Sequence, residues 1–142
     1  MKLILASDHA GFELKTYLKE FLQGHEIIDI GCDTVERCDY PDFGFIAAEE
    51  FLRQNADFGI LVCGSGIGIS IAANRSPKIR CALARSPEDA KLSREHNNAN
   101  MLALGERLTS KEDALKIVTT FLNTEFEGGR HEERVEKLGK LK

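Results

Sequence analysis

Short apolar segments alternate with amphipathic segments along the chain, and this alternation limits the possible folds more than any other feature. Between the apolar segments, hydrophobic residues recur at helical spacing, as at Leu14, Leu18 and Phe21. Strands that alternate with helices form a parallel sheet covered on both faces. The sequence therefore predicts a three-layer α/β/α sandwich with a five-stranded, Rossmann-like parallel sheet. The predicted strands are residues 2–6, 26–30, 58–63, 79–84 and 100–104.

The chain is expected to form one domain over residues 1–142. Its length suits a single hydrophobic core, and no repeat, low-complexity tract or linker divides it. Residues 32–41 read as a polar loop. Pro87 is expected to open one helix and Ser110 to cap another. A charged helix at about 130–141 is expected to end the domain.

Charge and composition argue against several classes of partner. The net charge of −4 does not indicate the positively charged surface that binds a nucleic acid. No early apolar run is long enough for a signal peptide or a membrane span, so we expect a cytoplasmic protein. The spacing of the cysteines fits neither a zinc site nor a disulfide framework, and no histidine and carboxylate spacing indicates a metal. Four free thiols are expected, at Cys32, Cys38, Cys63 and Cys81.

The carboxyl ends of the predicted strands are where such a fold binds ligands. The segment Cys-Gly-Ser-Gly-Ile-Gly at residues 63–68 lies in the middle of that edge. Its glycines let backbone amides approach an oxyanion, and the following helix N-terminus favours a thiolate at Cys63. A tight turn with a buried cysteine is the alternative interpretation. The segment lacks the lysine of a nucleotide-binding P-loop.

Asp8 and His9 follow the first strand, so both are expected at the same edge. They offer a proton acceptor and an imidazole that titrates near neutral pH. A helix cap and a solvated turn residue would explain them equally well. His96 lies where a helix gives way to the last strand, and with Cys63 it could act as a general acid or base.

Arg130 and Arg134 are four residues apart, so on a helix they share one face. Two guanidinium groups on one face can grip a phosphate bidentately. An exposed helix whose charges pair with Glu132 and Glu133 is the alternative interpretation.

Five stretches form a recognisable combination, in order and over nearly the whole chain. They are SDHAGF at 7–12, DYPD at 39–42, CGSGIGISIAAN at 63–74, SREHN at 93–97 and EGGRH at 127–131. Together they resemble the ribose-5-phosphate isomerase B family, which includes galactose-6-phosphate and allose-6-phosphate isomerases. The resemblance implies an aldose–ketose isomerase without metal or organic cofactor. It also implies a homodimer or tetramer whose active sites combine residues from two subunits.

The resemblance further implies interconversion of D-ribose 5-phosphate and D-ribulose 5-phosphate through an enediolate, in the non-oxidative pentose phosphate pathway. In this interpretation Cys63 moves the proton between C1 and C2 with help from Ser65, and Asp8 and His96 open the furanose ring. Ile69 stands where other members carry a catalytic glutamate.

The expected substrate contacts follow from the same resemblance. His9, Arg130 and Arg134 bind the phosphate, Asn97 holds a substrate oxygen, and glycine amides hold the enediolate. The full expected binding set is His9, Tyr40, Gly64, Gly66, Gly68, Asn97, Arg107, Arg130 and Arg134.

Three alternatives stay open at this point. The first is a hexose-6-phosphate isomerase of the same family, acting on allose or galactose 6-phosphate. The second is a non-catalytic sugar-phosphate-binding module, which could lose Cys63 or His96 while keeping Arg130 and Arg134. The third is a redox or structural flavodoxin-like module, in which the C-terminal arginines have no role.

Overall fold

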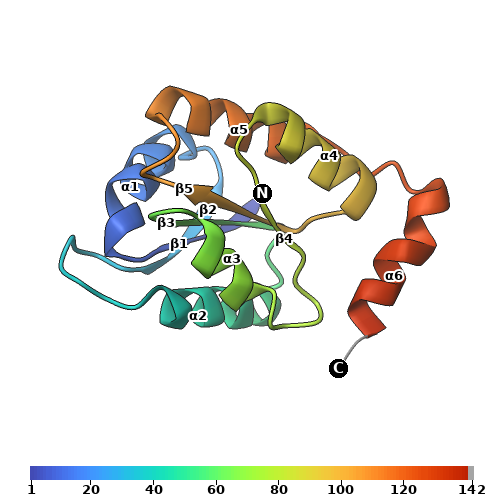
Figure 1. The fold of residues 1–142 in the computed structure, drawn as a ribbon, viewed down its shortest axis with the longest axis horizontal. Coiled ribbons are helices and arrows are strands. Elements are labelled where there is room, and N and C mark those ends of the chain that lie inside the picture. Colours follow the sequence, from blue (N-terminus) through green and yellow to red (C-terminus); the bar gives the residue numbers. More distant parts are fainter. Residues whose placement is uncertain (141–142) are drawn as a thin grey trace.

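The computed structural model describes residues 1–140 and contains one parallel sheet between two layers of helices (Figure 1). The strands lie in the order β2-β1-β3-β5-β4, and all pairs are parallel. The predicted three-layer α/β/α sandwich with five strands is therefore confirmed. The strands are β1 (Lys2–Ser7), β2 (Glu26–Gly31), β3 (Phe58–Cys63), β4 (Cys81–Leu83) and β5 (Met101–Gly105).

Helices of the two layers pack on opposite faces of this sheet. In Figure 1, α4 and α5 lie on one side of the strands and α2 and α3 on the other. α1 joins α4 and α5 in one apolar cluster, and α2 and α3 share a second cluster. The helices are α1 (Phe12–Phe21), α2 (Tyr40–Arg53), α3 (Ile67–Ala73), α4 (Pro87–Asn97), α5 (Lys111–Asn123) and α6 (Glu132–Lys140), with short 3-10 turns η1 (His9–Gly11) and η2 (Gly129–His131).

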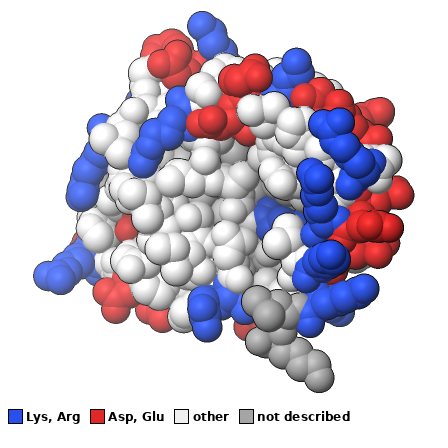
Figure 2. All heavy atoms as spheres, turned by 45° about the vertical axis from the view of Figure 1, so that its right-hand side comes forward, with Lys and Arg blue, Asp and Glu red and all other residues white. Residues whose placement is uncertain are grey.

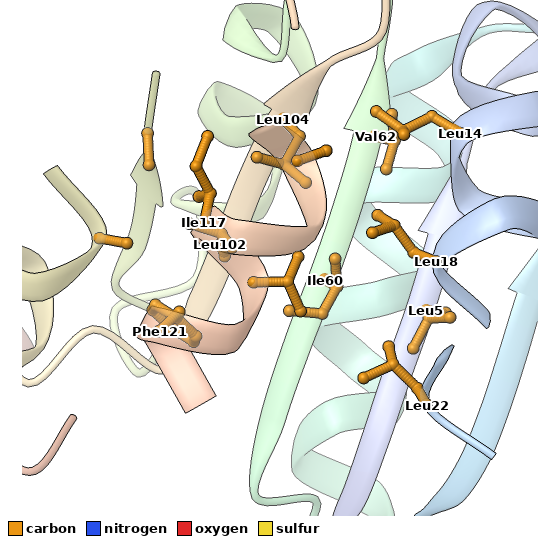
Figure 3. Packing of buried hydrophobic residues seen from close by; sticks show 14 of the residues in the cluster. Leu5, Leu14, Leu18, Leu22, Ile60, Val62, Leu102, Leu104, Ile117 and Phe121 are labelled. Carbon is orange, nitrogen blue, oxygen red and sulfur yellow. The ribbon is translucent and has the colours of Figure 1, made fainter. Parts of the chain in front are cut away.

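The alternation of side chains along each strand creates these two cores. In β1, Leu5 points toward α1, whereas Ile4 points toward α2. Figure 3 shows Leu14 and Leu18 of α1 meeting the strand residues of the first cluster. Each such side chain stabilises the fold by about 1.5–3 kcal/mol on burial. The sheet is thus held rigidly from both sides, and so are the loops that leave its ends.

The starts of β4 and α2 differ from the predicted ones. β4 begins at Cys81 instead of residue 79, because the Asn100 side chain accepts the Arg80 amide (2.8 Å) before the regular ladder starts. α2 begins at Tyr40 and not after the predicted loop, because Pro41 fits the first helical turn, where its missing N–H is not needed.

The helix starts predicted at Pro87 and Ser110 are confirmed. Pro87 is the first residue of α4, and the Ser110 hydroxyl accepts a hydrogen bond from the Asp113 amide (3.1 Å). The last helix begins at Glu132, after η2, and residue 141 of its predicted span lies outside the described residues. Between residues 1 and 140, no helix is both long enough and apolar enough to cross a membrane.

A buried ion pair fixes the loop that follows β2. Lys15 is 1% exposed, and its ammonium group donates to Asp29 Oδ1 (2.7 Å) and to the Cys32 carbonyl (2.8 Å). Burial alone would raise the pKa of Asp29, but the hydrogen bond and charge of Lys15 outweigh it and lower that pKa. The start of the loop at residues 32–39 is therefore anchored to α1.

Candidate active site

A cavity of about 550 Å³ opens at the carboxyl ends of the central strands. β1 leads to α1 on one face of the sheet and β3 leads to α3 on the other, so their loops diverge and leave a crevice between them. The polar residues around it come from four loops. They are Asp8 and His9 after β1, Tyr40 at the start of α2, Cys63, Gly64, Ser65 and Gly68 after β3, and Arg107 after β5.

The thiol of Cys63 stands where β3 ends at this cavity. The residue is 4% exposed, and its sulfur accepts a hydrogen bond from the Gly66 amide (3.1 Å). Gly66 has a φ of 79°, a left-handed conformation that glycine adopts readily. The turn therefore curls back so that a backbone donor meets the sulfur.

Ser65 lines the same cavity as Cys63 and precedes Gly66, the N-cap residue of α3. Its hydroxyl oxygen accepts a hydrogen bond from the Ile67 amide (3.1 Å). A hydroxyl that accepts in this way keeps its own proton to donate elsewhere. Ile69, one turn further along, is completely buried in the second core cluster. The only ionisable side chain of the segment at residues 63–70 is thus the Cys63 thiol.

Asp8 and His9 reach the cavity from the end of β1. Asp8 is 5% exposed and accepts the Gly11 amide (3.0 Å), so it caps η1 and lines the cavity at once. His9 Nδ1 lies 3.2 Å from the Cys38 amide nitrogen and 3.1 Å from the Cys38 carbonyl oxygen. When the Cys38 amide donates to Nδ1, a neutral His9 carries its proton on Nε2. That nitrogen can then donate to an anion.

The loops around the cavity contact one another through their backbones. A Cβ atom on Gly105 would lie 2.5 Å from the Ser65 carbonyl oxygen, and one on Gly11 would overlap the Val62 carbonyl. The Glu106 amide donates to the Cys63 carbonyl (2.9 Å) at the same junction. The floor of the cavity is therefore fixed by main-chain packing. We use the name strand-end cluster for the residues of the four loops at this cavity, which are Asp8, His9, Tyr40, Cys63, Gly64, Ser65, Gly68 and Arg107.

Four other predicted site residues lie away from this cavity. They are His96, Asn97, Arg130 and Arg134. His96 and Asn97 are the last residues of α4, and β5 begins directly afterwards at Met101. A helix that returns antiparallel to the strands ends at their amino edge, opposite the cavity. Arg130 and Arg134 are exposed on η2 and α6, beside acidic side chains. Within residues 1–140, none of these four residues lines the cavity around Cys63.

We call His96, Asn97, Arg130 and Arg134 the C-terminal cluster. Within one chain, the predicted site residues therefore form two separate groups, and the expectation that two subunits share each active site stays a prediction. Figure 1 shows the physical reason: α6 stands off the end of the domain where α4 finishes, away from the loop between β3 and α3. α6 buries none of its own residues.

Two histidines stack within this second region. The rings of His96 and His131 are 4.5 Å apart and inclined by 18°, and Glu127 Oε1 lies 3.6 Å and 3.7 Å from their Nε2 atoms. Burial, followed by the charges of His96 and Arg130, lowers the pKa of His131. The sequence analysis missed Glu127 and His131 as partners of His96. Glu127 and His131 are four residues apart, and this spacing was the signal in the sequence that could have indicated a pair on one side of a turn.

Among the described residues, His96, Glu127 and His131 form one group of donor atoms that could hold a metal, all within 4.8 Å of one another. The spacing in the sequence had not indicated it. The lone pairs of the two imidazoles lie in their ring planes, and stacked planes do not converge on one ion. The geometry therefore suits a stacked pair of imidazoles better than a metal centre.

The sequence analysis also missed a carboxylate that ties the cavity to α1. Glu106 Oε1 accepts the Leu14 amide (2.6 Å), and burial raises the pKa of Glu106. Cys81, predicted to be a core residue, packs against the second apolar cluster, and burial raises the pKa of its thiol. Exposed Ile67, Ile71 and Leu108 add an apolar rim to the cavity.

Comparison with known proteins identifies the family. The family model described as Ribose/Galactose Isomerase matches residues 3–138. Ribose-5-phosphate isomerase B of Escherichia coli is 43% identical over 139 residues, which cover 96% of this chain and 93% of that protein. The structure of Clostridium thermocellum ribose-5-phosphate isomerase B superposes with a TM-score of 0.96 at 50% identity, covering 99% of this chain and 96% of that one.

A third relative has been solved with a sugar phosphate. Ribose-5-phosphate isomerase B from Mycoplasma genitalium, with bound ribulose-5-phosphate, matches with a TM-score of 0.92 at 38% identity, covering 98% of this chain and 94% of that one. Sequence, fold and coverage agree across these comparisons. The chain is therefore an isomerase and belongs to the ribose/galactose isomerase family.

Proposed function

We propose that the protein interconverts D-ribose 5-phosphate and D-ribulose 5-phosphate, a step of the non-oxidative pentose phosphate pathway. The observation that carries this proposal is the Cys63 thiol at the floor of the cavity, with the Gly66 amide 3.1 Å from its sulfur. A backbone N–H binds a thiolate more strongly than a thiol. Cys63 therefore serves as the base that moves a proton between C1 and C2 of the open-chain sugar.

The developing enediolate needs hydrogen-bond donors beside this base. The Gly66 amide is already occupied by the Cys63 sulfur, so we assign this task to the amides of Gly64 and Gly68, which line the cavity. The Ser65 hydroxyl keeps a free proton for a sugar oxygen. One such donor typically contributes roughly 3–4 kcal/mol to transition-state stabilisation.

The phosphate needs positive donors at a distance from the reacting carbons. His9, Arg107 and Tyr40 all line the cavity, and we assign them to this task. Arg130 and Arg134 are the strongest bidentate donors of the predicted set, but they belong to the C-terminal cluster. The proposed chemistry therefore requires the two clusters to come together.

We propose that a second copy of the chain brings them together in a homodimer with shared sites. His96 and Asp8 then open the furanose ring across the interface, Asn97 holds a substrate oxygen, and Arg130 and Arg134 bind the phosphate. A surface region with few charged side chains supports this association. Figure 2 shows one face whose centre lacks charged side chains and whose border carries them.

The exposed side chains of α2 and α3 are suited to such an interface. Phe45 and Leu52 line a groove of about 370 Å³ between these helices, and Ile71 is 60% exposed at the rim of the cavity. Contiguous exposed apolar side chains on a protein of this size commonly mark an association surface. Here Phe45 and Leu52 lie in the groove between α2 and α3, and Ile71 lines the cavity that also contains the proposed catalytic thiol.

A direct assay tests the proposal. The purified protein, with a chelator present, is incubated separately with D-ribose 5-phosphate, D-allose 6-phosphate and D-galactose 6-phosphate, and ketose formation is followed. Turnover of the pentose phosphate is the expected result. Turnover of a hexose phosphate alone would change the proposed substrate, and binding without turnover would indicate a sugar-phosphate-binding module. Light scattering coupled to the assay tests the dimer, because a monomer with full activity contradicts shared sites.

A further inference from the structure

The segment between α5 and α6 is fixed against the end of α4 by its backbone. Arg94 of α4 is buried, and its guanidinium group donates to the Thr124 carbonyl (3.0 Å). The Glu127 amide donates to the Glu95 carbonyl (3.1 Å). Figure 1 shows the chain passing the end of α4 on its way to α6. The segment is therefore held beside the last turn of α4, which carries His96.

A glycine turn then brings His131 onto the ring of His96. Gly128 and Gly129 have φ values of 71° and 57°, which residues with a Cβ rarely adopt. The His131 amide donates to the Gly128 carbonyl (3.1 Å), and the two imidazole rings lie 4.5 Å apart and 18° from parallel. His131 is 6% exposed, whereas 39% of the His96 side chain is exposed. One ring thus forms a buried backing, and the other stays partly open to solvent.

Glu127 lies at the edge of both rings. Its Oε1 atom is 3.6 Å from His96 Nε2 and 3.7 Å from His131 Nε2. The edge of an aromatic ring is positively polarised, so a carboxylate attracts it. Rotation of the His96 ring out of the stack would lose this attraction as well as the contact with His131. The orientation of the His96 ring is therefore fixed from two directions.

We propose that His131 and Glu127 are positioning residues for His96 in the opening of the furanose ring. This inference rests on the proposed function, in which His96 and Asp8 open that ring. In this step the C1–O4 bond breaks and its electron pair goes to O4, which takes up one proton, while the C1 hydroxyl gives up another and becomes the aldehyde. Proton transfer needs the imidazole in a fixed direction, and a misplacement of about 1 Å can cost on the order of 10²-fold in rate.

The two sugar phosphates need ring opening to different degrees. Ribose 5-phosphate closes into a furanose through its C4 hydroxyl. Ribulose 5-phosphate has its carbonyl at C2 and its phosphate on the C5 oxygen, so it cannot form a five-membered ring. Exchange of a C1 hydrogen of ribulose 5-phosphate with solvent therefore needs the proposed base Cys63 but no ring opening. A misplaced His96 should consequently impair one substrate and spare the other.

The test measures turnover of ribose 5-phosphate and, by NMR in D₂O, deuterium incorporation at C1 of ribulose 5-phosphate. His131→Ala is expected to lower kcat for ribose 5-phosphate on the order of 10²-fold, with KM and the incorporation nearly unchanged. His131→Phe keeps a flat ring in the stack and is expected to retain most of the turnover. His96→Gln should show the same pattern as His131→Ala with a larger loss, and Cys63→Ala should lose both reactions. Glu127→Gln is expected to lose roughly twofold to fivefold in kcat, and Glu125→Gln, exposed on the same segment, is the matched control.

The outcomes separate positioning from a merely structural role. Equal losses in both reactions after His131→Ala, with a higher KM, would mean that His131 only holds the segment that carries Arg130, and would overturn the proposal. Full turnover by His131→Ala would overturn it as well, and so would a His131→Phe protein as impaired as His131→Ala. A wild type that converts no ribose 5-phosphate would contradict the proposed function and this inference together, whereas an active wild type confines a failure to the inference.

Discussion

The strand-end cluster and the C-terminal cluster differ in how deeply their residues are buried and in how firmly the fold holds them. Cys63 and Asp8 are almost completely buried and sit at the ends of strands held by two hydrophobic cores. Arg130 and Arg134 are exposed, and α6, which carries Arg134, buries none of its own residues. The first cluster is preorganised by the fold of one chain. The arginines of the second cluster stand on an exposed helix, so in the proposed dimer we expect a partner subunit to position them.

Removal of the proposed base tests the first half of this comparison most severely. Cys63→Ala is expected to lower kcat on the order of 10³-fold, the usual contribution of a positioned proton-transfer group. The melting temperature should fall only modestly, because the substitution removes one buried sulfur atom and its hydrogen bond from the Gly66 amide. Cys81→Ala, in a core strand and outside the cavity, is the matched control and should keep nearly full activity. Full activity of Cys63→Ala would show that the thiol only packs.

Mixing two inactive variants tests whether the clusters come from different chains. Cys63→Ala and His96→Gln are unfolded together in equal amounts and refolded. If each site takes one cluster from each subunit, a random mixture of dimers recovers about a quarter of wild-type activity. Variants refolded separately and then assayed serve as the control. Failure to recover activity, with dimers formed, would place both clusters of each site in one chain.

Loss of the arginines should affect binding more than chemistry. Arg134→Ala is expected to raise KM for ribose 5-phosphate on the order of 10-fold to 100-fold, since charge-assisted hydrogen bonds to phosphate are the strong ones. Turnover of ribose, which lacks the phosphate, should stay at its low wild-type value. Lys137→Ala on the same helix is the control. An unchanged KM would support the interpretation of α6 as an exposed charged helix.

The smallest expected effect concerns pH and the stacked histidines. The pKa of His131 is lowered in the folded protein, mainly by burial. As the pH falls below the ordinary histidine value of about 6.5, the unfolded chain takes up the proton first, and the folded state loses stability. Urea unfolding at pH 7.5 and 5.5 should show this loss, and His131→Gln should reduce it. His25→Gln, in a connecting turn, is the control; an equal reduction there would contradict the assignment.

The strand-end cluster was largely predictable because its position follows from local patterns. A residue directly after a buried parallel strand lies at the carboxyl edge whatever the rest of the chain does, which placed Asp8, His9, Cys63 and Arg107 correctly. Tyr40 was assigned to the site but to a loop, since Pro41 reads equally as a loop residue and as a first-turn helix residue.

The C-terminal cluster was not predictable in the same way. The pattern shows that His96 ends a helix, and therefore that it faces the opposite edge from Cys63. What meets it there depends on contacts between residues distant in the sequence, such as the stack with His131. Association between chains leaves no periodicity in a single sequence. A resemblance to a family can suggest such a site, but hydrophobic spacing cannot.

The backbone contact between Gly105 and Ser65 bears on how the enzyme could change its substrate. Because the loops of the strand-end cluster touch through their main chains, the floor of the cavity offers few side chains whose replacement would lengthen or shorten it. In the proposed dimer, a longer sugar phosphate would instead be accommodated where Arg130 and Arg134 approach the cavity. If this dimer forms as proposed, changes of substrate length are expected to accumulate in α6 and at the proposed subunit contact, while the thiol and its glycine turn stay as they are.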